Sequence, residues 1–257
     1  MDYLNNFKKY RYLLYELVKK DIKLKYRRSY LGILWTLMEP ILTTLVLNFV
    51  FGTIFSNNKQ KHFIIYILIG RLLYSCFSTA TKTAMRSIRA NQGMIKKVYV
   101  PKYIYPMASV LSNFVIFLIS LIVLVIFCVI ERVGFSVYSF QAIIPIITLF
   151  ILCIGTGMLL ATIAVYFRDM EYLWEVMTML IMYCSAIFYP VSRLGTKGDL
   201  LKFNPLYTII ANFRTAVIDG KMIDWWFAGY GLIFSVVILA VGVYVFKKKQ
   251  DNFILHI

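Results

Sequence analysis

Six long apolar stretches alternate with polar, basic stretches along the chain, and each is close to the length that crosses a bilayer. They are 31–55, 63–81, 103–130, 142–167, 172–191 and 225–246. Because a spanning helix needs about 20 mostly apolar residues, the pattern predicts an all-α membrane protein with six transmembrane helices. The first stretch is longer than the apolar core of a signal peptide, so we expect it to be a retained helix.

The stretch before the first apolar run, 3–28, has apolar residues at a helical spacing. These residues lie three, four or seven positions apart and are Tyr3, Phe7, Tyr10, Leu14, Leu17 and Leu24. Lys and Arg residues fill many of the positions between them. This pattern is typical of a basic amphipathic helix that lies in the membrane interface. We therefore divide the chain into this helix, 1–30, and a six-helix membrane domain, 31–257.

Two further segments lie between the predicted spans. The first, 82–102, is polar and basic, and we expect it to contain a short helix parallel to the membrane. The second, 192–221, is too long for a hairpin and too apolar for a free loop. We expect one or two short re-entrant helices there, because irregular backbone at membrane depth needs protein partners.

Composition agrees with a membrane protein. Hydrophobic residues make up 60% of the chain, charged residues only 16%, and the mean hydropathy is +0.73. An ordinary globular domain is about 25% charged, so a soluble enzyme, a disordered chain and a disulfide-rich secreted domain are excluded. The four cysteines all lie in apolar runs, and we interpret them as small buried side chains. They are Cys76, Cys128, Cys153 and Cys184.

The positive charge predicts the orientation in the membrane. The net charge is +16, and with the N-terminus inside, 19 Lys and Arg residues lie on the inner side and 8 on the outer side. Because basic loops stay in the cytoplasm, we expect a multi-pass plasma-membrane protein with both termini cytoplasmic. We assign the charge to membrane lipids rather than to nucleic acid, because the hydropathy is high.

The motifs of common enzymes are missing. The chain has no phosphate-binding GxxxxGK[ST] loop, and Gly155 and Gly157 lie within a predicted span, where glycine allows close helix packing. Its two histidines, His62 and His256, are far apart, and no metal-binding cluster is present. We therefore expect no enzymatic activity and no cofactor in this chain.

Three charged residues lie within the predicted spans, and Glu39, before Pro40, is the strongest functional candidate. It either pairs with a neighbouring polar group or lines a hydrophilic path. Aromatic side chains deep in the spans either pack in the core or form a track for sugars. Together with Glu39, the channel candidates are Trp35, Tyr74, Tyr183, Phe188 and Tyr189. A lipid phosphate entering from the inner leaflet would first meet the cations beside the first span, Arg27 and Arg28.

Several motifs together resemble one family, the permease subunits of type-2 ABC exporters for polysaccharides and polyol phosphates. This family includes the permeases that translocate O-antigen and wall teichoic acid. The similar motifs are LGILWTLMEP (31–40), NQGMIKKVYVPKYIYP (91–106), VYFRDMEYL (165–173), AIFYP (186–190), FNPLYTII (203–210) and FRTAV (213–217). The chain departs from the family at Gly70 and Arg71, near which an apolar residue and a tryptophan are common.

The resemblance implies a homodimer with two separate ATP-binding subunits, which bind ATP and Mg²⁺, on its cytoplasmic face. It implies export of a lipid-linked glycan through a pore between the two permeases. The basic N-terminal helix and the loop after the second span would dock on the ATPases. The candidate coupling residues are Arg86, Arg89, Asn91, Lys96, Lys97, Tyr99 and Pro101. The stretch 192–221 would form outer gate helices, with candidate residues Asn204, Pro205 and Arg214.

Three other functions remain open at this point. A type-2 ABC permease for a drug, a peptide or another lipid would share the fold and the partner. A membrane enzyme acting on lipid-linked sugars would need an essential carboxylate or histidine and no ATP. An ion-coupled transporter would show several buried charges and internal repeats, which the sequence lacks.

Overall fold

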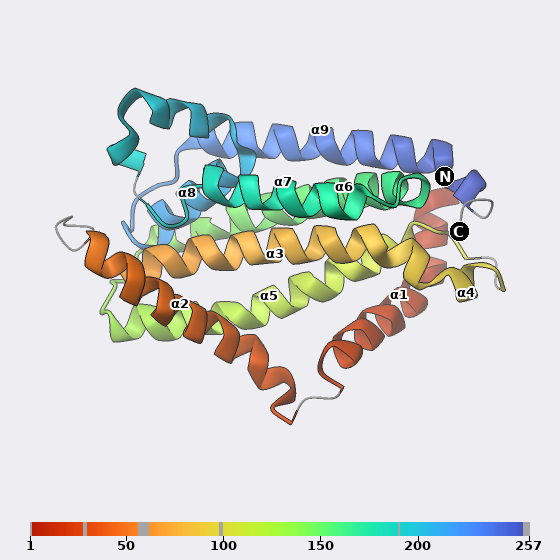
Figure 1. The fold of residues 1–257 in the computed structure, drawn as a ribbon, viewed down its shortest axis with the longest axis horizontal. Coiled ribbons are helices and arrows are strands. Elements are labelled where there is room, and N and C mark those ends of the chain that lie inside the picture. The colour runs from red at the N-terminus through yellow and green to blue at the C-terminus, as the bar shows by residue number, and fades with distance from the viewer. Residues whose placement is uncertain (1, 28–29, 56–61, 98–99, 190, 254–257) are drawn as a thin grey trace.

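The computed structural model describes residues 2–27, 30–55, 62–97, 100–189 and 191–253. All regular structure in these ranges is helical (Figure 1). The α-helices are α1 (Asp2–Tyr26), α2 (Trp35–Phe55), α3 (Phe63–Ala90), α4 (Gln92–Ile95), α5 (Ile104–Ile130), α6 (Ile143–Tyr166), α7 (Met170–Cys184), α8 (Pro205–Val217) and α9 (Trp225–Lys249). The 3₁₀ segments are η1 (Gly32–Leu34), η2 (Val137–Ala142), η3 (Val191–Phe203) and η4 (Gln250–Asn252).

The bundle is built around α3, which α5, α6 and α8 contact directly. Along its most apolar part 72% of the residues are buried, whereas the corresponding figure for α2 is 11%. The start of α1, α4 and the end of α9 lie at one end of the bundle, and η3 and α8 lie at the other (Figure 1). The two predicted functional regions, the basic loop and the outer stretch, therefore occupy opposite ends.

Glycines allow α6 and α9 to approach closely. A Cβ added at Gly155 would lie 2.6 Å from the backbone nitrogen of Leu239, and a Cβ at Gly242 would collide with the carbonyl oxygen of Gly155. Small residues at helix interfaces let backbones meet in this way within membranes. The prediction that Gly155 and Gly157 serve packing is confirmed, since a Cβ at Gly157 would lie 2.9 Å from Ala84 Cβ.

Pro40 lies inside α2 without breaking it. A proline has no N–H, so the carbonyl four residues earlier, that of Thr36, loses its helical partner. The hydroxyl of Ser120 on α5 donates a hydrogen bond of 3.1 Å to this carbonyl. A side chain from a neighbouring helix thus replaces the lost bond, as is usual for prolines in spanning helices.

Five of the six predicted spans are confirmed as helices long and apolar enough to cross a membrane: Gly32–Phe51, Phe63–Ala90, Ile104–Ile130, Val137–Tyr166 and Trp225–Asn252. The sixth predicted span, 172–191, is not among them, and its predicted bounds are longer than the helix. The helix there, α7, has 15 residues and ends at Cys184, after which Ala186 adopts a positive φ of 48°. Fifteen residues rise about 22 Å, less than the roughly 30 Å hydrocarbon core.

The boundary after the second span is also corrected. The sequence predicts the end of that span near residue 81, but α3 continues to Ala90 and leaves only the four-residue α4 in the loop. Residues 82–90 are polar on one face and apolar on the other, with Ala84 and Ile88 fully buried. The change in polarity therefore marks the end of the apolar stretch and not the end of the helix.

The N-terminal segment is helical as predicted, and this helix, α1, packs along α5. Its place in the membrane interface stays a prediction. Leu17 is 4% exposed and belongs to a second core cluster with Ile95, Ile104 and Phe253. The hydroxyl of Ser109 on α5 also donates a hydrogen bond of 3.4 Å to the Asp21 carboxylate. Partial burial raises the pKa of this carboxyl group above its ordinary value. One cluster thus joins α1, α4, α5 and the end of the described chain.

Candidate functional site

The short helix α4 lies at the end of the bundle where α1 starts. Its Ile95 is buried, and Lys96 and Lys97 follow it with exposed side chains. Asn91 precedes α4, donates a hydrogen bond of 2.8 Å to the Ser87 carbonyl and accepts one of 3.2 Å from Lys20 Nζ on α1. Two predicted coupling residues thus lie on the surface, and a third fixes α4 to its neighbours.

The remaining predicted coupling residues have different surroundings. Arg86 Nε lies 2.9 Å from Glu171 Oε2, and Arg89 Nη1 lies 3.8 Å from the other oxygen of the same carboxylate. Arg89 also donates a hydrogen bond to the Ala164 carbonyl. These arginines therefore join the extension of α3 to α7. Pro101 is half-buried before α5, and Tyr99 lies outside the described residues.

The contact between α3 and α7 continues toward the other end of the bundle. Lys82 Nζ lies 3.5 Å from Glu175 Oε1, and Trp174 Nε1 donates a hydrogen bond of 3.1 Å to Thr81 Oγ1. The hydroxyl of Tyr74 donates one of 3.0 Å to the carbonyl of residue 178. Tyr74 is 7% exposed, and its hydroxyl fixes α7 to α3. Its role as a channel residue stays a prediction.

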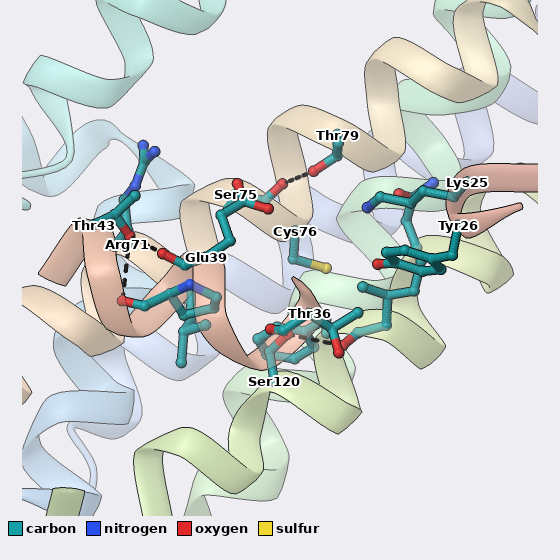
Figure 2. Close-up of a pocket in the computed structure, with 15 residues that line it drawn as sticks. Lys25, Tyr26, Thr36, Glu39, Thr43, Arg71, Ser75, Cys76, Thr79 and Ser120 are labelled. Atoms are coloured by element: carbon teal, nitrogen blue, oxygen red, sulfur yellow. Dashed lines mark hydrogen bonds between the residues drawn. The ribbon is translucent and has the colours of Figure 1, made fainter. Parts of the chain in front are cut away.

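A small polar pocket lies where α1, α2, α3 and α5 meet. Figure 2 shows Arg71 and Thr43 at one side of it, Lys25 and Tyr26 at the other, and Glu39 between them. Its volume is about 60 Å³, room for roughly four water molecules. Partial burial lowers the pKa of Lys25, and the negative charge of Glu39 acts in the opposite direction.

Hydroxyl groups supply much of the remaining polar lining. Thr43 donates a hydrogen bond of 2.7 Å to the backbone carbonyl of Glu39, and Thr79 donates one to that of Ser75. Both threonines thereby satisfy carbonyls of their own helices, and Asn113 adds an amide from α5. The pocket therefore combines one carboxylate, two cations and neutral hydrogen-bonding groups inside the bundle, so Glu39 faces a polar space.

The other channel candidates divide into two groups. Trp35 and Tyr183 are 42% and 50% exposed, on surfaces of α2 and α7 that face away from the bundle. Phe188 instead stacks on Phe51 with ring centroids 5.4 Å apart, and Tyr189 donates a hydrogen bond of 2.6 Å to the Tyr183 carbonyl. None of these four side chains is part of the lining of the pocket around Glu39.

At the opposite end of the bundle, Arg214 of α8 is buried and 7% exposed. Its Nε donates a hydrogen bond of 3.2 Å to the Tyr66 carbonyl, and Nη1 donates one of 3.0 Å to the Ala186 carbonyl. Nη2 donates to the carbonyls of Tyr66 and Ile187, at 3.0 and 3.3 Å. The guanidinium also stacks on the Tyr66 ring, 3.4 Å from its centroid. One side chain thus connects α8, α3 and the turn after α7.

Two other residues predicted for the outer gate define the start of α8. Asn204 is the N-cap, and its side chain accepts a hydrogen bond of 3.0 Å from the Leu206 N–H. Its amide donates to the Cys184 carbonyl and to Ser185 Oγ, at 3.1 and 3.0 Å. Pro205 occupies the first helical position, where a missing N–H has no cost. Asn204 therefore ties α8 to the end of α7.

Sequence reasoning missed three features of these sites. The carboxylate of Glu171 was not identified as the partner of Arg86, and the turn at Ala186 was not foreseen. Gly70 was noted only as a departure from a family pattern, yet a Cβ there would lie 2.6 Å from Arg214 Nη2. A glycine that faces an arginine far along the chain leaves no local signal in the sequence.

Two further expectations concern cysteines and metals. Cys76, Cys128 and Cys153 are buried as predicted, but the prediction is wrong for Cys184, which is exposed at the end of α7. Among the described residues no group of three or more His, Cys, Asp or Glu side chains is placed to hold a metal ion.

The pair Arg27 and Arg28, predicted to meet a lipid phosphate, is described only in part. Arg27 is exposed after α1, and Arg28 lies outside the described residues.

The fold and these sites define a helical membrane protein with a basic segment at one end and, at the other, the short helix α8 held by Arg214 and Asn204. The family model for ABC-2 type transporters matches residues 12–218, and the chain belongs to this family. A protein of this family is the membrane subunit of a transporter and is not itself an enzyme.

Several curated proteins are similar over nearly the whole chain. The "O-antigen export system permease protein RfbA" of Klebsiella pneumoniae is 25% identical over 244 residues, which cover 94% of this chain and 93% of that protein. A protein of the same name from Myxococcus xanthus is 25% identical over 249 residues, 95% of each chain. The "Polysialic acid transport protein KpsM" of Escherichia coli is 23% identical over 235 residues, 90% of this chain and 91% of that protein.

Proposed function

We propose that this chain is the transmembrane subunit of an ATP-driven exporter that moves a lipid-linked polysaccharide, or a teichoic-acid-type polymer, across the plasma membrane. The observation that carries the proposal is the similarity to O-antigen and polysialic acid export proteins along almost the entire chain. Moving a polyhydroxyl or anionic chain through hydrocarbon is prohibitively unfavourable, so such a polymer needs a polar or aromatic path.

Six crossings of the membrane agree with the arrangement of the helices. The end of α6 and the end of α9 both lie near α4, so the chain must return to the opposite end between residues 166 and 225 (Figure 1). The 15-residue α7 and the turn that follows it make this return, which is the fifth crossing in chain order, with α7 packed along α3. The positive-inside rule then places both termini and α4 in the cytoplasm.

The coupling surface is formed by α4 and the basic residues after it. Two copies of a separate ATP-binding subunit, which hold ATP and Mg²⁺, dock on Lys96 and Lys97 of two permeases. The exposure of these side chains and the attachment of Asn91 to α1 support this assignment. Arg86 and Arg89 act indirectly, because Glu171 already holds them against α7.

The polymer path lies between two copies of the chain. Support comes from the apolar faces that α2 and α7 leave exposed, to which Trp35 and Tyr183 contribute. Glu39 borders the path from the polar pocket, and Arg27 and Arg28 meet the lipid phosphate at the inner leaflet. At the outer side α8 forms the gate, which Arg214, Asn204 and Pro205 hold in place.

The test is co-purification of the full-length chain with the ATP-binding subunit of its host, followed by ATPase assays in proteoliposomes. We expect a complex of two permeases and two ATPases whose hydrolysis rate rises when lipid-linked glycan from the host is added. A complex that responds to drugs, peptides or simple lipids but not to the glycan would contradict the substrate class. A permease that purifies alone and acts on lipid-linked sugars without ATP would contradict the whole proposal.

A further inference from the structure

An open groove lies between α1 and α2, with α5 as its floor. Its volume is about 840 Å³, within the range of pockets that hold small organic ligands. Figure 1 shows α1 and α2 diverging from the connection between them, so that the two helices form the sides of a V. This groove adjoins the small polar pocket around Glu39, because Tyr26 lines both.

The lining of the groove is apolar on one side and cationic on the other. Two neighbouring ridges of side chains along α1 face the groove. Within each ridge, successive residues are four positions apart, which is about one helical turn. One ridge is apolar and consists of Val18, Ile22 and Tyr26. The other carries Lys19, Lys23 and Arg27. Residues 31–34, Leu37 and Val115 complete an apolar floor and opposite wall.

Among the described residues, no counterion faces the cations of the groove. No acidic residue lines the groove, and Lys19, Lys23 and Arg27 form no ion pair or hydrogen bond with the described part of the chain. Positive charges in a row beside an apolar surface match a ligand with an anionic head and a hydrophobic tail.

From this complementarity we propose that the groove binds an anionic glycerophospholipid of the inner leaflet. The phosphate group lies on Lys19 and Lys23, and the acyl chains lie between the apolar ridge of α1 and the wall formed by 31–34 and Leu37. Anionic phospholipids are concentrated in the cytoplasmic leaflet, where α1 lies by the positive-inside rule. A second copy of this chain is a poor match, because it carries 28 basic and only 12 acidic residues.

The bound lipid would supply packing that the protein lacks at this point. Helix α1 packs on α5, and α2 packs on α3 and α5, while the groove separates α1 from α2. Leu31, Ile33 and Leu34 are 46–56% exposed on the groove side of the connection. A lipid that fills the groove therefore fixes the angle between α1 and α2.

The test counts phospholipids that remain bound to the full-length chain after reconstitution in phosphatidylglycerol–phosphatidylcholine vesicles and extraction into mild detergent. Native mass spectrometry should show one retained phosphatidylglycerol per permease for the wild type. The double variant Lys19→Gln/Lys23→Gln should lose at least 80% of it. The matched variant Lys247→Gln/Lys248→Gln should keep it, because it removes the same charge from exposed cytoplasmic positions outside the groove. Equal retention by the two double variants would overturn the proposal.

A second measurement identifies the occupant directly. A photo-reactive amino acid at position 34 should crosslink to a phospholipid, and Val115→Trp, which fills the floor of the groove, should abolish this product. A product with the mass of a second permease, of the ATP-binding subunit or of a polyprenyl phosphate would overturn the proposal. None of these results depends on polysaccharide export, so the proposed function can fail or stand independently.

Discussion

Arg214 is the residue at which the account of the outer gate is most sharply testable. Its guanidinium donates four hydrogen bonds to three carbonyls and stacks on an aromatic ring. Each hydrogen bond from a charged donor contributes about 1.5–3 kcal/mol, and a desolvated cation–π contact about 2 kcal/mol. These values are not additive, and breaking a buried hydrogen-bond network is among the few changes that cost more than about 3 kcal/mol.

We therefore expect Arg214→Gln to lower the free energy of unfolding by about 3–4 kcal/mol. For a chain of this size each kcal/mol corresponds to roughly 2–4 °C in Tm, so the melting temperature should fall by about 6–16 °C. Arg214→Lys should recover only part of this loss, because a single ammonium group cannot reach carbonyls on both sides as the planar guanidinium does. The assay is thermal unfolding of the detergent-purified permease, followed by tryptophan fluorescence.

The control is Arg168→Gln, which removes an arginine whose side chain is exposed between α6 and α7. Gly70→Ala should destabilise in a similar way, since its Cβ would lie 2.6 Å from Arg214 Nη2. When it is combined with Arg214→Gln, Gly70→Ala should lower the melting temperature by much less than it does alone. If Arg214→Gln melted at the same temperature as Arg168→Gln, the assignment of Arg214 as the pin of α8 would be refuted.

Three further predictions concern packing, the proline and the coupling surface. Gly242→Ala should greatly reduce the folded fraction measured by fluorescence size-exclusion chromatography, because its Cβ collides with a backbone carbonyl of α6. Gly229→Ala should leave the folded fraction unchanged, because its Cβ meets no atom within 4 Å. Ser120→Ala should lower the free energy of unfolding by about 1–2 kcal/mol in the thermal unfolding assay used for Arg214. The reason is that the Thr36 carbonyl, which Pro40 leaves without its helical partner, also loses the Ser120 hydroxyl. An unchanged Tm would contradict this prediction. Lys96→Glu combined with Lys97→Glu should weaken binding of the ATP-binding subunit at least tenfold in a pull-down at ordinary salt, and an intact complex would place the docking surface elsewhere.

Helices were the most predictable part of the fold, because long apolar runs have few alternatives in a membrane. The predicted starts and ends of the first, third, fourth and sixth spans lie within a few residues of the observed helices. The second was misjudged at its end, since 82–90 is polar in composition yet apolar on one helical face. The fifth was misjudged in length, since apolar residues continue through a turn in which Ala186 has a positive φ.

The sites were predictable only where the signal is local. Asn204 and Pro205 form an N-cap signature that can be read directly from neighbouring residues. The partners of Arg214, by contrast, include Tyr66, which lies 148 positions earlier in the chain. Likewise, the family resemblance alone made Arg86 a candidate coupling residue, and its partner Glu171 lies 85 positions away in the chain. Long-range pairing depends on packing, which a single sequence does not encode locally.

The central claim is that this chain carries a polymer across the plasma membrane with energy from a partner ATPase. The most direct measurement is deletion of its gene in the native host, with separate quantification of the cell-surface and intracellular polysaccharide. The account predicts that lipid-linked polymer accumulates in the cytoplasm and disappears from the surface, and that the full-length chain restores it only when its ATP-binding partner can hydrolyse ATP. An unchanged amount of surface polysaccharide in the deletion strain would contradict it.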